Sequence, residues 1–447
     1  MNRNLNKIYI ALIFLIAAYI RINYVLITPF EFKIDAWSMY NYALNIKKGL
    51  YYGHAFGDCW ARYAYWPPLY IFLSGFVYKF FGEGMGIDVM RLLQAFISAL
   101  SCCVVYLVTA EAVKTYSRRY KEGALLSGLL MCVNPRMIVY TNHLYVETVF
   151  IFLYMLAVYY LLKHYKYEVF SRSGKANGRP LIKYRYLAAG GALLGLGNLT
   201  RPVILLVPFV MFVLILLRPG KGKAVSMEKL KPALVSTAAI FAIMLAVISP
   251  WTLRNYIATG KVILIDTNGP INFYIAHNPL ANGSWVDVKP YTDANSLYET
   301  GYRQGVQYML QNPNKELQYT ILKQTMIFTN DDPHITESRK YLSQSLKLPF
   351  LQLPQASVSY LWLASGIMLL VTLLKLVITK KAGILLKEPA WIIGHIIYID
   401  LLILAFYFMP RYRIIIEPFL ICLIGMLAAL MLSCGSEASA KLSKRTK

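Results

Sequence analysis

Six charged residues stand out because they border or interrupt apolar segments, where a charge is costly without a partner or a function. They are Asp35, Glu147, Arg201, Arg254, Arg411 and Arg413. A carboxylate can accept the proton of an attacking hydroxyl group. The arginine fork binds phosphate through two parallel hydrogen bonds and can stabilise a departing phosphate. These residue types therefore suit transfer of a group from a phosphate-bearing donor.

Three of these residues also have an ordinary structural interpretation. Asp35 could be the N-cap of a helix that begins near Ala36. Glu147 could interact with the dipole of the helix that it begins. Arg413 could pair with Glu417 one helical turn later. Asp400 lies inside an apolar run, and the sequence names no partner for it.

A metal or nucleotide site is only weakly indicated. His54, His143 and His277 are scattered, and the six cysteines suggest neither a disulfide framework nor a zinc cluster. There is no phosphate-binding GKS/T loop and no GxGxxG motif after a strand. We therefore assign no metal ligands, and the cofactor is left unknown, with a divalent cation as one possibility.

The elements that must position these residues are apolar helices. The chain is 57% hydrophobic and 15% charged, with a mean hydropathy of +0.47, whereas soluble proteins carry about 25% charged residues. This composition predicts an all-α integral membrane protein with about ten transmembrane helices. The expected spans are 7–27, 88–110, 123–140, 145–162, 187–199, 202–217, 232–250, 357–378, 391–409 and 413–433.

The distribution of positive charge predicts the orientation. Of the 46 Lys and Arg residues, 26 fall in alternate connections and in the two ends of the chain, which should therefore face the cytoplasm. The net charge of +24 thus reflects membrane topology, and we expect no nucleic-acid partner. Residues 251–356 carry nine basic and eight acidic residues and are expected outside.

Two apolar segments conflict with this orientation if each is interpreted as a single helix that crosses the membrane. Trp66–Phe81 would invert the orientation if it crossed the membrane, so we expect an interfacial helix in the first outer loop. Leu187–Leu217 is expected to be a hairpin with a short first arm, which leaves Arg201 in an outward-facing cavity. Asp35, Glu147, Arg201 and Arg411 then lie on one side of the membrane.

The domain organisation follows from this topology. Residues 1–250 form a transmembrane catalytic region that includes the first outer loop, 28–87. Residues 251–356 form a large extracytoplasmic loop, and 357–447 form the last transmembrane helices and a basic cytoplasmic tail. We expect a multi-pass protein of the plasma membrane with its active site outside.

The order of short motifs resembles multi-spanning glycosyltransferases of the GT-C type that use polyprenyl-phosphate sugars, such as protein O-mannosyltransferases and lipid A aminoarabinose transferases. The resemblance covers roughly residues 7–430. It rests on Asp35 with Tyr40, Pro67-Pro68-Leu69-Tyr70, Glu147, Thr200-Arg201-Pro202, Pro250-Trp251 with Arg254-Asn255-Tyr256, Thr267-Asn268-Gly269, Asn278-Pro279 and Arg411-Tyr412-Arg413. Many members have an acidic pair in the first loop, whereas Ala36 follows Asp35 here.

The resemblance implies an enzyme that transfers a sugar from a polyprenyl-phosphate donor to a hydroxyl group of a lipid, protein or glycan, with inversion. Asp35 would be the base, and Glu147 would orient the acceptor or hold a cation. The arginines at 201, 254, 411 and 413 would bind the donor phosphate. Two alternatives stay open: a ligase or polymerase of polyprenyl-diphosphate glycans, and a non-catalytic lipid flippase or transporter.

Overall fold

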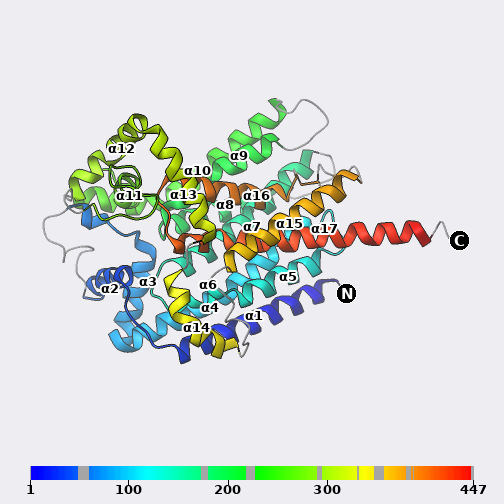
Figure 1. Cartoon of the computed structure of the whole chain (residues 1–447), viewed down its shortest axis with the longest axis horizontal. Helices are drawn as coiled ribbons and strands as arrows, with labels where there is room; N and C mark the ends of the chain where they lie inside the picture. The colour runs from blue at the N-terminus through cyan, green and yellow to red at the C-terminus, as the bar shows by residue number, and fades with distance from the viewer. Residues whose placement is uncertain are drawn as a thin grey trace.

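The computed structural model consists of a long helical bundle with a cap of shorter helices at one end (Figure 1). It describes residues 2–48, 60–172, 180–217, 227–288, 294–329, 332–346, 357–378, 384–385 and 387–443. Within these ranges the chain is almost entirely helical, and its only β-pairing is an isolated bridge between Ser284 and Phe408. The predicted all-α class is therefore confirmed.

The helices of the bundle coincide with the ten predicted spans. They are α1 (Asn2–Ile27), α4 (Glu83–Val113), α5 (Tyr120–Val133) followed by α6 (Pro135–Val139), α7 (Glu147–Arg172), α8 (Pro180–Asn198), α9 (Val207–Leu217), α10 (Met227–Thr259), α15 (Ser357–Ile378), α16 (Ala390–Ala405) and α17 (Glu417–Ser443).

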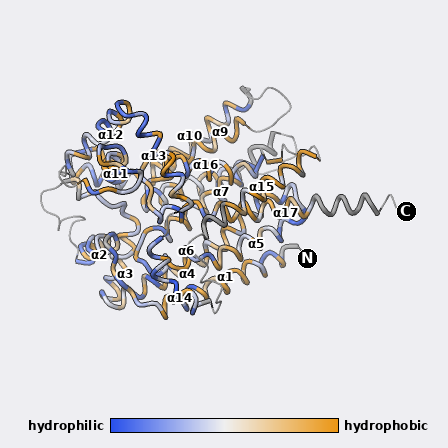
Figure 2. The backbone as a smooth tube through the Cα atoms, in the orientation of Figure 1, coloured by the Kyte–Doolittle hydropathy of each residue, from blue (hydrophilic) through white to orange (hydrophobic). Residues whose placement is uncertain are grey.

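Length and composition alone support fewer crossings. Among the described residues, 5 helical segments are long and apolar enough to cross a membrane: Asn4–Ile27, Glu83–Val113, Glu147–Lys166, Lys229–Thr259 and Pro410–Ser433. Apolar residues are concentrated along bundle helices such as α1 and α15 (Figure 2). The membrane class is thus established, and the count of ten stays a prediction.

Both special segments are helical as predicted. The first is α3 (Pro68–Phe81), which packs on α2 (Ile34–Lys47) and α4. Gly82, with a φ of 78°, separates α3 from α4, a conformation that favours glycine. The second segment is broken between α8 and α9, where η3 (Pro202–Ile204) lies. However, α8 begins at Pro180, so the first arm of the hairpin is longer than predicted.

The predicted span 123–140 is interrupted at Asn134-Pro135. Proline has no N–H group to continue the hydrogen bonds of a helix, so α5 ends at Val133. The side chain of Asn134 accepts a hydrogen bond from the Met137 amide at 3.0 Å and caps α6. The last carbonyl groups of α5, at Met131 and Cys132, accept hydrogen bonds from the buried guanidinium of Arg21 in α1.

The cap lies at the end of the bundle opposite the two chain termini (Figure 1). It comprises α2, η2 (Trp60–Ala64), α3, α11 (Asn268–Ala276), α12 (Ala294–Gln311), α13 (Pro313–Thr329) and α14 (Pro333–Leu346), with η7 (Pro410–Ile415) beneath it. The described residues of the region 251–356 therefore contain four helices of their own, and α10 extends into the region as far as Thr259.

Candidate active site

Asp35 and Arg411 form an ion pair between the first loop and the start of the last apolar helix. Asp35 lies in the first turn of α2, whose N-cap is Lys33. The predicted capping role for Asp35 is therefore wrong, and its side chain points elsewhere. Its Oδ2 accepts a hydrogen bond from Arg411 Nη1 at 2.5 Å, and the two side chains are 31% and 19% exposed. A carboxylate that is close to solvent and not used for capping is accessible to a substrate.

Glu147 and Arg201 form a second pair. Glu147 is the first residue of α7, two residues after the predicted start of this span and within its first turn, where the sequence placed it. Its Oε1 accepts a hydrogen bond from Arg201 Nη1 at 2.9 Å. Arg201 has an extended backbone between α8 and η3, so the break in the predicted hairpin directs its guanidinium toward Glu147. Both side chains are largely buried.

Tyr412 connects the two pairs. The guanidinium of Arg201 lies 4.8 Å from the centroid of the Tyr412 ring, and that of Arg411 lies 5.7 Å from it. Arg411 also lies 5.7 Å from the ring of Tyr145. Cations over aromatic faces are held by the ring quadrupole. Four predicted residues from four distant segments thus form one cluster around a tyrosine.

The carboxylates of this cluster compensate the charges of its arginines. The Asp35 carboxylate accepts a hydrogen bond from the Arg411 guanidinium, and the Glu147 carboxylate accepts one from Arg201. In a partly buried site, a fixed cation interacts more strongly with an anion than it does in water. Arg201 and Arg411 therefore place two guanidinium groups close to one ring.

Arg413 is not part of this cluster. It is fully buried, and its Nη2 donates a hydrogen bond to the Met326 carbonyl of α13 at 2.5 Å. The predicted pairing of Arg413 with Glu417 is wrong, because Glu417 forms an ion pair with Arg136 of α6. Arg413 thus attaches η7 to α13.

Arg254 lies beside the cluster and supports the first loop. Its Nη1 donates a hydrogen bond to the Tyr63 carbonyl at 2.5 Å, and its guanidinium lies 4.5 Å from the Trp251 ring. Tyr63 belongs to η2. The contacts of Arg254 therefore position a loop segment, and a phosphate-binding role is not supported by them.

A buried ionic network underlies the site and was missed from the sequence. Arg136 contacts Asp332 at 3.0 Å and also pairs with Glu417, and all three side chains are at most 3% exposed. Asn134 donates a further hydrogen bond to Glu417 at 2.9 Å. The signal was available in Arg136, an arginine inside a predicted span, which should be treated as functional or paired.

The remaining polar residues have structural partners. Asp400 of α16 accepts two hydrogen bonds from Gln324 of α13, at 3.0 and 3.1 Å. His277 lies 2.8 Å from Glu316 and contacts the Ala405 carbonyl. The ring centroids of His143 and His334 lie 4.5 Å apart with the rings tilted at 47°, and burial lowers the pKa of His143 to about 3.

His143 and His277 therefore have separate partners, and His54 lies outside the described residues. Nowhere in the described ranges do three or more His, Cys, Asp or Glu side chains gather in a way that could hold a metal ion.

One further carboxylate, that of Asp266, has a raised pKa. Asp266 precedes α11 and accepts a hydrogen bond from the Asn268 amide at 3.1 Å. Burial raises its pKa to about 7, against the opposing effect of the amide hydrogen bonds. Asn268 in turn donates a hydrogen bond to the Tyr65 carbonyl at 2.5 Å, so Asp266 lies at a junction between α11 and the first loop.

The sequence and fold are similar to those of known membrane glycosyltransferases. Residues 52–251, which are less than half of the chain, match the model of the Alg9-like mannosyltransferase family. The oligosaccharyltransferase of Archaeoglobus fulgidus, tethered to an acceptor peptide, superposes with a TM-score of 0.55 at 13% identity. That match covers 97% of this chain and 50% of the archaeal one.

A second structure of that archaeal enzyme contains an inhibitory peptide and a dolichol-phosphate. It superposes with a TM-score of 0.56 at 12% identity, over 100% of this chain and 52% of the other. The chain thus spans about half the length of these enzymes, and at such identity the likeness shows the fold. No curated protein sequence matches. The predicted resemblance to the GT-C type is confirmed.

Proposed function

We propose that this membrane glycosyltransferase moves a sugar from a polyprenyl-phosphate donor to an acceptor hydroxyl group, with Asp35 as the base. The observation that carries the proposal is the pair of Arg–carboxylate contacts that share the Tyr412 ring. This arrangement offers two cations for a phosphate and two carboxylates for an incoming hydroxyl. The cap end of the bundle, where this site lies, would face the outside of the plasma membrane.

The reaction is a single displacement at the anomeric carbon. Asp35 Oδ2 accepts the proton of the acceptor hydroxyl as its oxygen forms the new bond to that carbon. The bond from the anomeric carbon to the donor phosphate oxygen breaks, and the lipid phosphate leaves with the electron pair. Arg201 and Arg411 stabilise the negative charge that develops on the phosphate. Attack from the opposite face inverts the anomeric centre.

Donor binding would also free the base. In the structure Asp35 accepts a hydrogen bond from Arg411, which competes with its function as a proton acceptor. A donor phosphate can bind the guanidinium fork through two parallel hydrogen bonds, and its arrival would release Asp35 toward the acceptor. Glu147, which is 4% exposed, would orient the acceptor or hold a bound cation.

The test is transfer by the purified protein in lipid nanodiscs. Labelled polyprenyl-phosphate sugars are supplied singly, and the products are followed as labelled glycan and free polyprenyl phosphate. We expect transfer or slow hydrolysis of at least one such donor. The absence of both reactions with every monophosphate donor, with and without divalent cations, would reject the proposal.

A second candidate is transfer of an oligosaccharide, which the likeness to the archaeal oligosaccharyltransferase favours. The same nanodisc assay decides between the two when a polyprenyl-diphosphate oligosaccharide replaces the monophosphate sugar. Turnover of the diphosphate donor alone would establish the second candidate. The acceptor, whether lipid, protein or glycan, is found by supplying each class to the active donor complex.

A further inference from the structure

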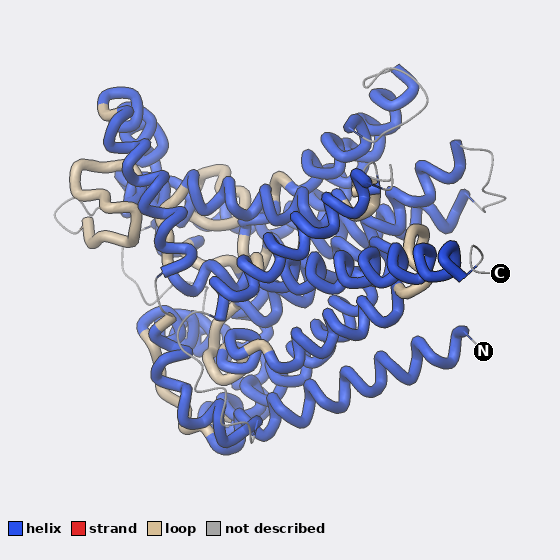
Figure 3. The backbone as a smooth tube through the Cα atoms, turned by 45° about the vertical axis from the view of Figure 1, so that its right-hand side comes forward, coloured by secondary structure: helices blue, strands red, loops and turns tan. Residues whose placement is uncertain are grey.

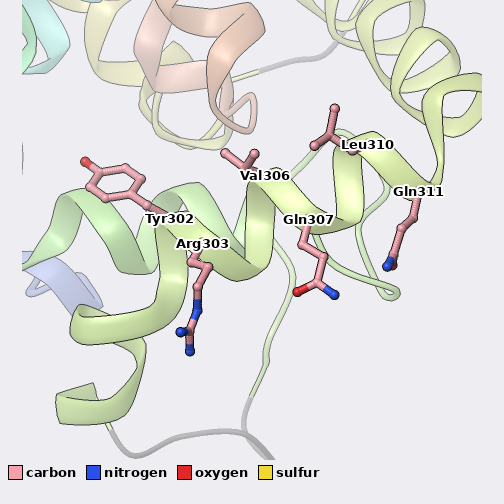
Figure 4. Close-up of a pocket in the computed structure, with 6 residues that line it drawn as sticks. All are labelled: Tyr302, Arg303, Val306, Gln307, Leu310 and Gln311. Carbon is pink, nitrogen blue, oxygen red and sulfur yellow. The ribbon is translucent and has the colours of Figure 1, made fainter.

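The hairpin of α12 and α13 exposes apolar side chains that the catalytic cluster does not use. Near its tip Leu310 is 78% exposed, Leu317 61% and Ile321 59%. A concavity of about 640 Å³ lies along α12, lined by Tyr302, Arg303, Val306, Gln307, Leu310 and Gln311. In Figure 4 the Val306 and Leu310 side chains point to one side of α12, away from Arg303, Gln307 and Gln311.

The exposed surface of α14, in the same region, differs from that of the hairpin. The exposed residues of α14 are Pro333, Thr336, Glu337, Lys340 and Gln344, and none of them is a large hydrophobic residue. This is the surface expected of a helix in water. Solvent therefore suits the outer face of α14, whereas the exposed face of the hairpin requires a different environment.

The apolar face of the hairpin continues into the membrane-facing surface of the bundle. Gln324, about one turn beyond Ile321, donates hydrogen bonds to Asp400 of α16. One residue after Asp400, Leu401 is 58% exposed. The buried Lys323 donates a hydrogen bond to the Leu404 carbonyl near the end of α16 at 2.7 Å. The hairpin is therefore fixed to the cap end of α16.

The same surface continues onto α9. Gly394 of α16 lies against Val210 and Leu214 of α9, while Phe209 and Val213 on the same helix are about half exposed. The hairpin and α9 project from the same side of the bundle in two views (Figures 1 and 3). An exposed apolar surface thus extends from the hairpin tip through α16 to α9, a helix whose eleven residues carry no charge.

We propose that the α12–α13 hairpin lies on the membrane, with Leu310, Leu317 and Ile321 in contact with lipid of the leaflet at the cap end. Lipid is the partner because the hairpin surface is continuous with exposed apolar residues of α16 and α9, two apolar helices that belong to predicted membrane spans. Amphipathic helices in this position place their apolar side near the boundary between head groups and acyl chains. Part of region 251–356 is then an element at the membrane interface and does not lie in water.

The polar residues near the end of α16 are consistent with a hairpin that lies at the membrane surface. Asp400 lies about one turn before the end of α16 at Ala405, and its hydrogen bonds to Gln324 satisfy a carboxylate near the head-group level. Lys315 at the start of α13 is exposed and can reach lipid phosphates. Polar residues thus lie beside the apolar face at the level where a bilayer becomes polar.

The test is photo-crosslinking of the full chain in nanodiscs of phosphatidylcholine. The photoreactive amino acid p-benzoylphenylalanine replaces Ile321 or Leu317, one at a time, and it replaces Lys340 of α14 as the matched control. After illumination, the labelled peptides are examined by mass spectrometry for phosphatidylcholine adducts. We expect adducts at positions 317 and 321 at least fivefold more abundant than at position 340.

Two results would overturn the proposal. Equal lipid adducts at positions 321 and 340 would mean that the hairpin has no special contact with the bilayer. Crosslinks from position 317 or 321 to a second polypeptide chain would identify a protein interface in place of lipid. Each variant is first checked for a melting temperature within a few degrees of the parent, so that a misfolded hairpin is not scored.

Discussion

Arg411 contacts Asp35 directly, and this contact couples the proposed donor site to the proposed base. The Oδ2 of Asp35 lies 2.5 Å from Arg411 Nη1, so each group already has a hydrogen-bond partner in the structure without substrate. An anion that replaces Asp35 as the partner of Arg411 would leave both carboxylate oxygens free to take a proton. Donor and base are therefore expected to act in sequence, with the donor binding first.

The first prediction concerns the base. Asp35→Asn keeps the size of the side chain but removes its proton affinity, and general-base catalysis typically contributes about 10²- to 10⁴-fold. We expect transfer to fall by about that factor while the melting temperature in detergent stays near that of the parent. Glu31→Gln is the matched control, because Glu31 is a 75% exposed carboxylate of the same loop. Full activity of Asp35→Asn would remove Asp35 from catalysis.

The second prediction concerns the ring between the arginines. Tyr412→Phe keeps the aromatic face, whereas Tyr412→Leu removes it. A cation–π contact contributes about 0.5–2 kcal/mol, so we expect Tyr412→Leu to raise the KM for donor by about threefold to thirtyfold. Tyr412→Phe should stay within about twofold of the parent. Equal KM values for both variants would show that the ring does not position the arginines.

Much of this site followed from the sequence, because the positive-inside rule assigned Asp35, Glu147, Arg201 and Arg411 to one face. Their pairing did not follow. Residues 35 and 411 are separated by 376 positions, and spacing carries no information about contacts over such a distance. The same limit explains the wrong partner given to Glu417. Local i+4 spacing favoured Arg413, but in the folded chain Arg136 of α6 pairs with Glu417.

At the scale of elements, α6 and α14 are joined through buried charges. Removing one member of a buried ion pair leaves its partners without compensation and typically costs about 3–5 kcal/mol. We therefore expect Arg136→Ala to lower the free energy of unfolding by about that amount, measured by denaturant titration in detergent. Arg119→Ala breaks the exposed Arg119–Glu122 pair and should cost about 1 kcal/mol or less. Similar losses in both variants would contradict a structural role for the buried network.

The start of α11 gives a prediction for pH. Burial raises the pKa of Asp266 to about 7, from a reference value of 3.8. A raised carboxyl pKa means that the folded state binds the proton more tightly than the unfolded state. Its contribution to stability is complete below about pH 4 and is lost as the pH rises to about 7.

Replacing Asp266 should therefore flatten this part of the stability profile. We expect Asp266→Asn to reduce the fall in melting temperature between pH 4 and 7, because asparagine has no proton to lose. Asp287→Asn, at an exposed position of the same region, should leave the profile unchanged. An Asp266→Asn profile parallel to that of the parent would show that Asp266 does not titrate in this range.

The elements themselves were predictable where a physical rule acts locally. Proline at 135 and 202 and glycine at 82 coincide with breaks between helices, because proline lacks the N–H group that continues a helix and glycine adopts conformations that end one. Pro232 and Pro250, by contrast, lie inside α10. The start of α8 at Pro180 was missed, since a polar, basic sequence hides a helix that extends beyond the apolar core. The four helices of 251–356 were expected only as unspecified structure, because their partners are distant segments.

At the scale of the whole molecule, the four proposed catalytic and donor-binding residues, Asp35, Glu147, Arg201 and Arg411, lie at the cap end, and the described connection between α4 and α5 lies toward the other end. Positive charge in short loops is retained on the cytoplasmic side. In the described residues 251–288, 294–329 and 332–346, the numbers of basic and acidic residues are nearly equal. A segment with so little net charge suits translocation across the membrane. If the charge rule fixes the orientation, α14 is outside the cell, and the connection between α4 and α5 is inside.

Cysteine accessibility tests this orientation directly. Lys340→Cys in α14 and Arg119→Cys before α5 are introduced into a parent whose Cys59 and Cys434 are replaced by serine. Both positions are exposed, so accessibility depends on the side of the membrane. In intact cells a membrane-impermeant maleimide should label position 340 and not position 119, and permeabilisation should allow labelling of both. The reverse pattern would place the site on the cytoplasmic face, and the proposed donor would then have to be presented from the inner leaflet.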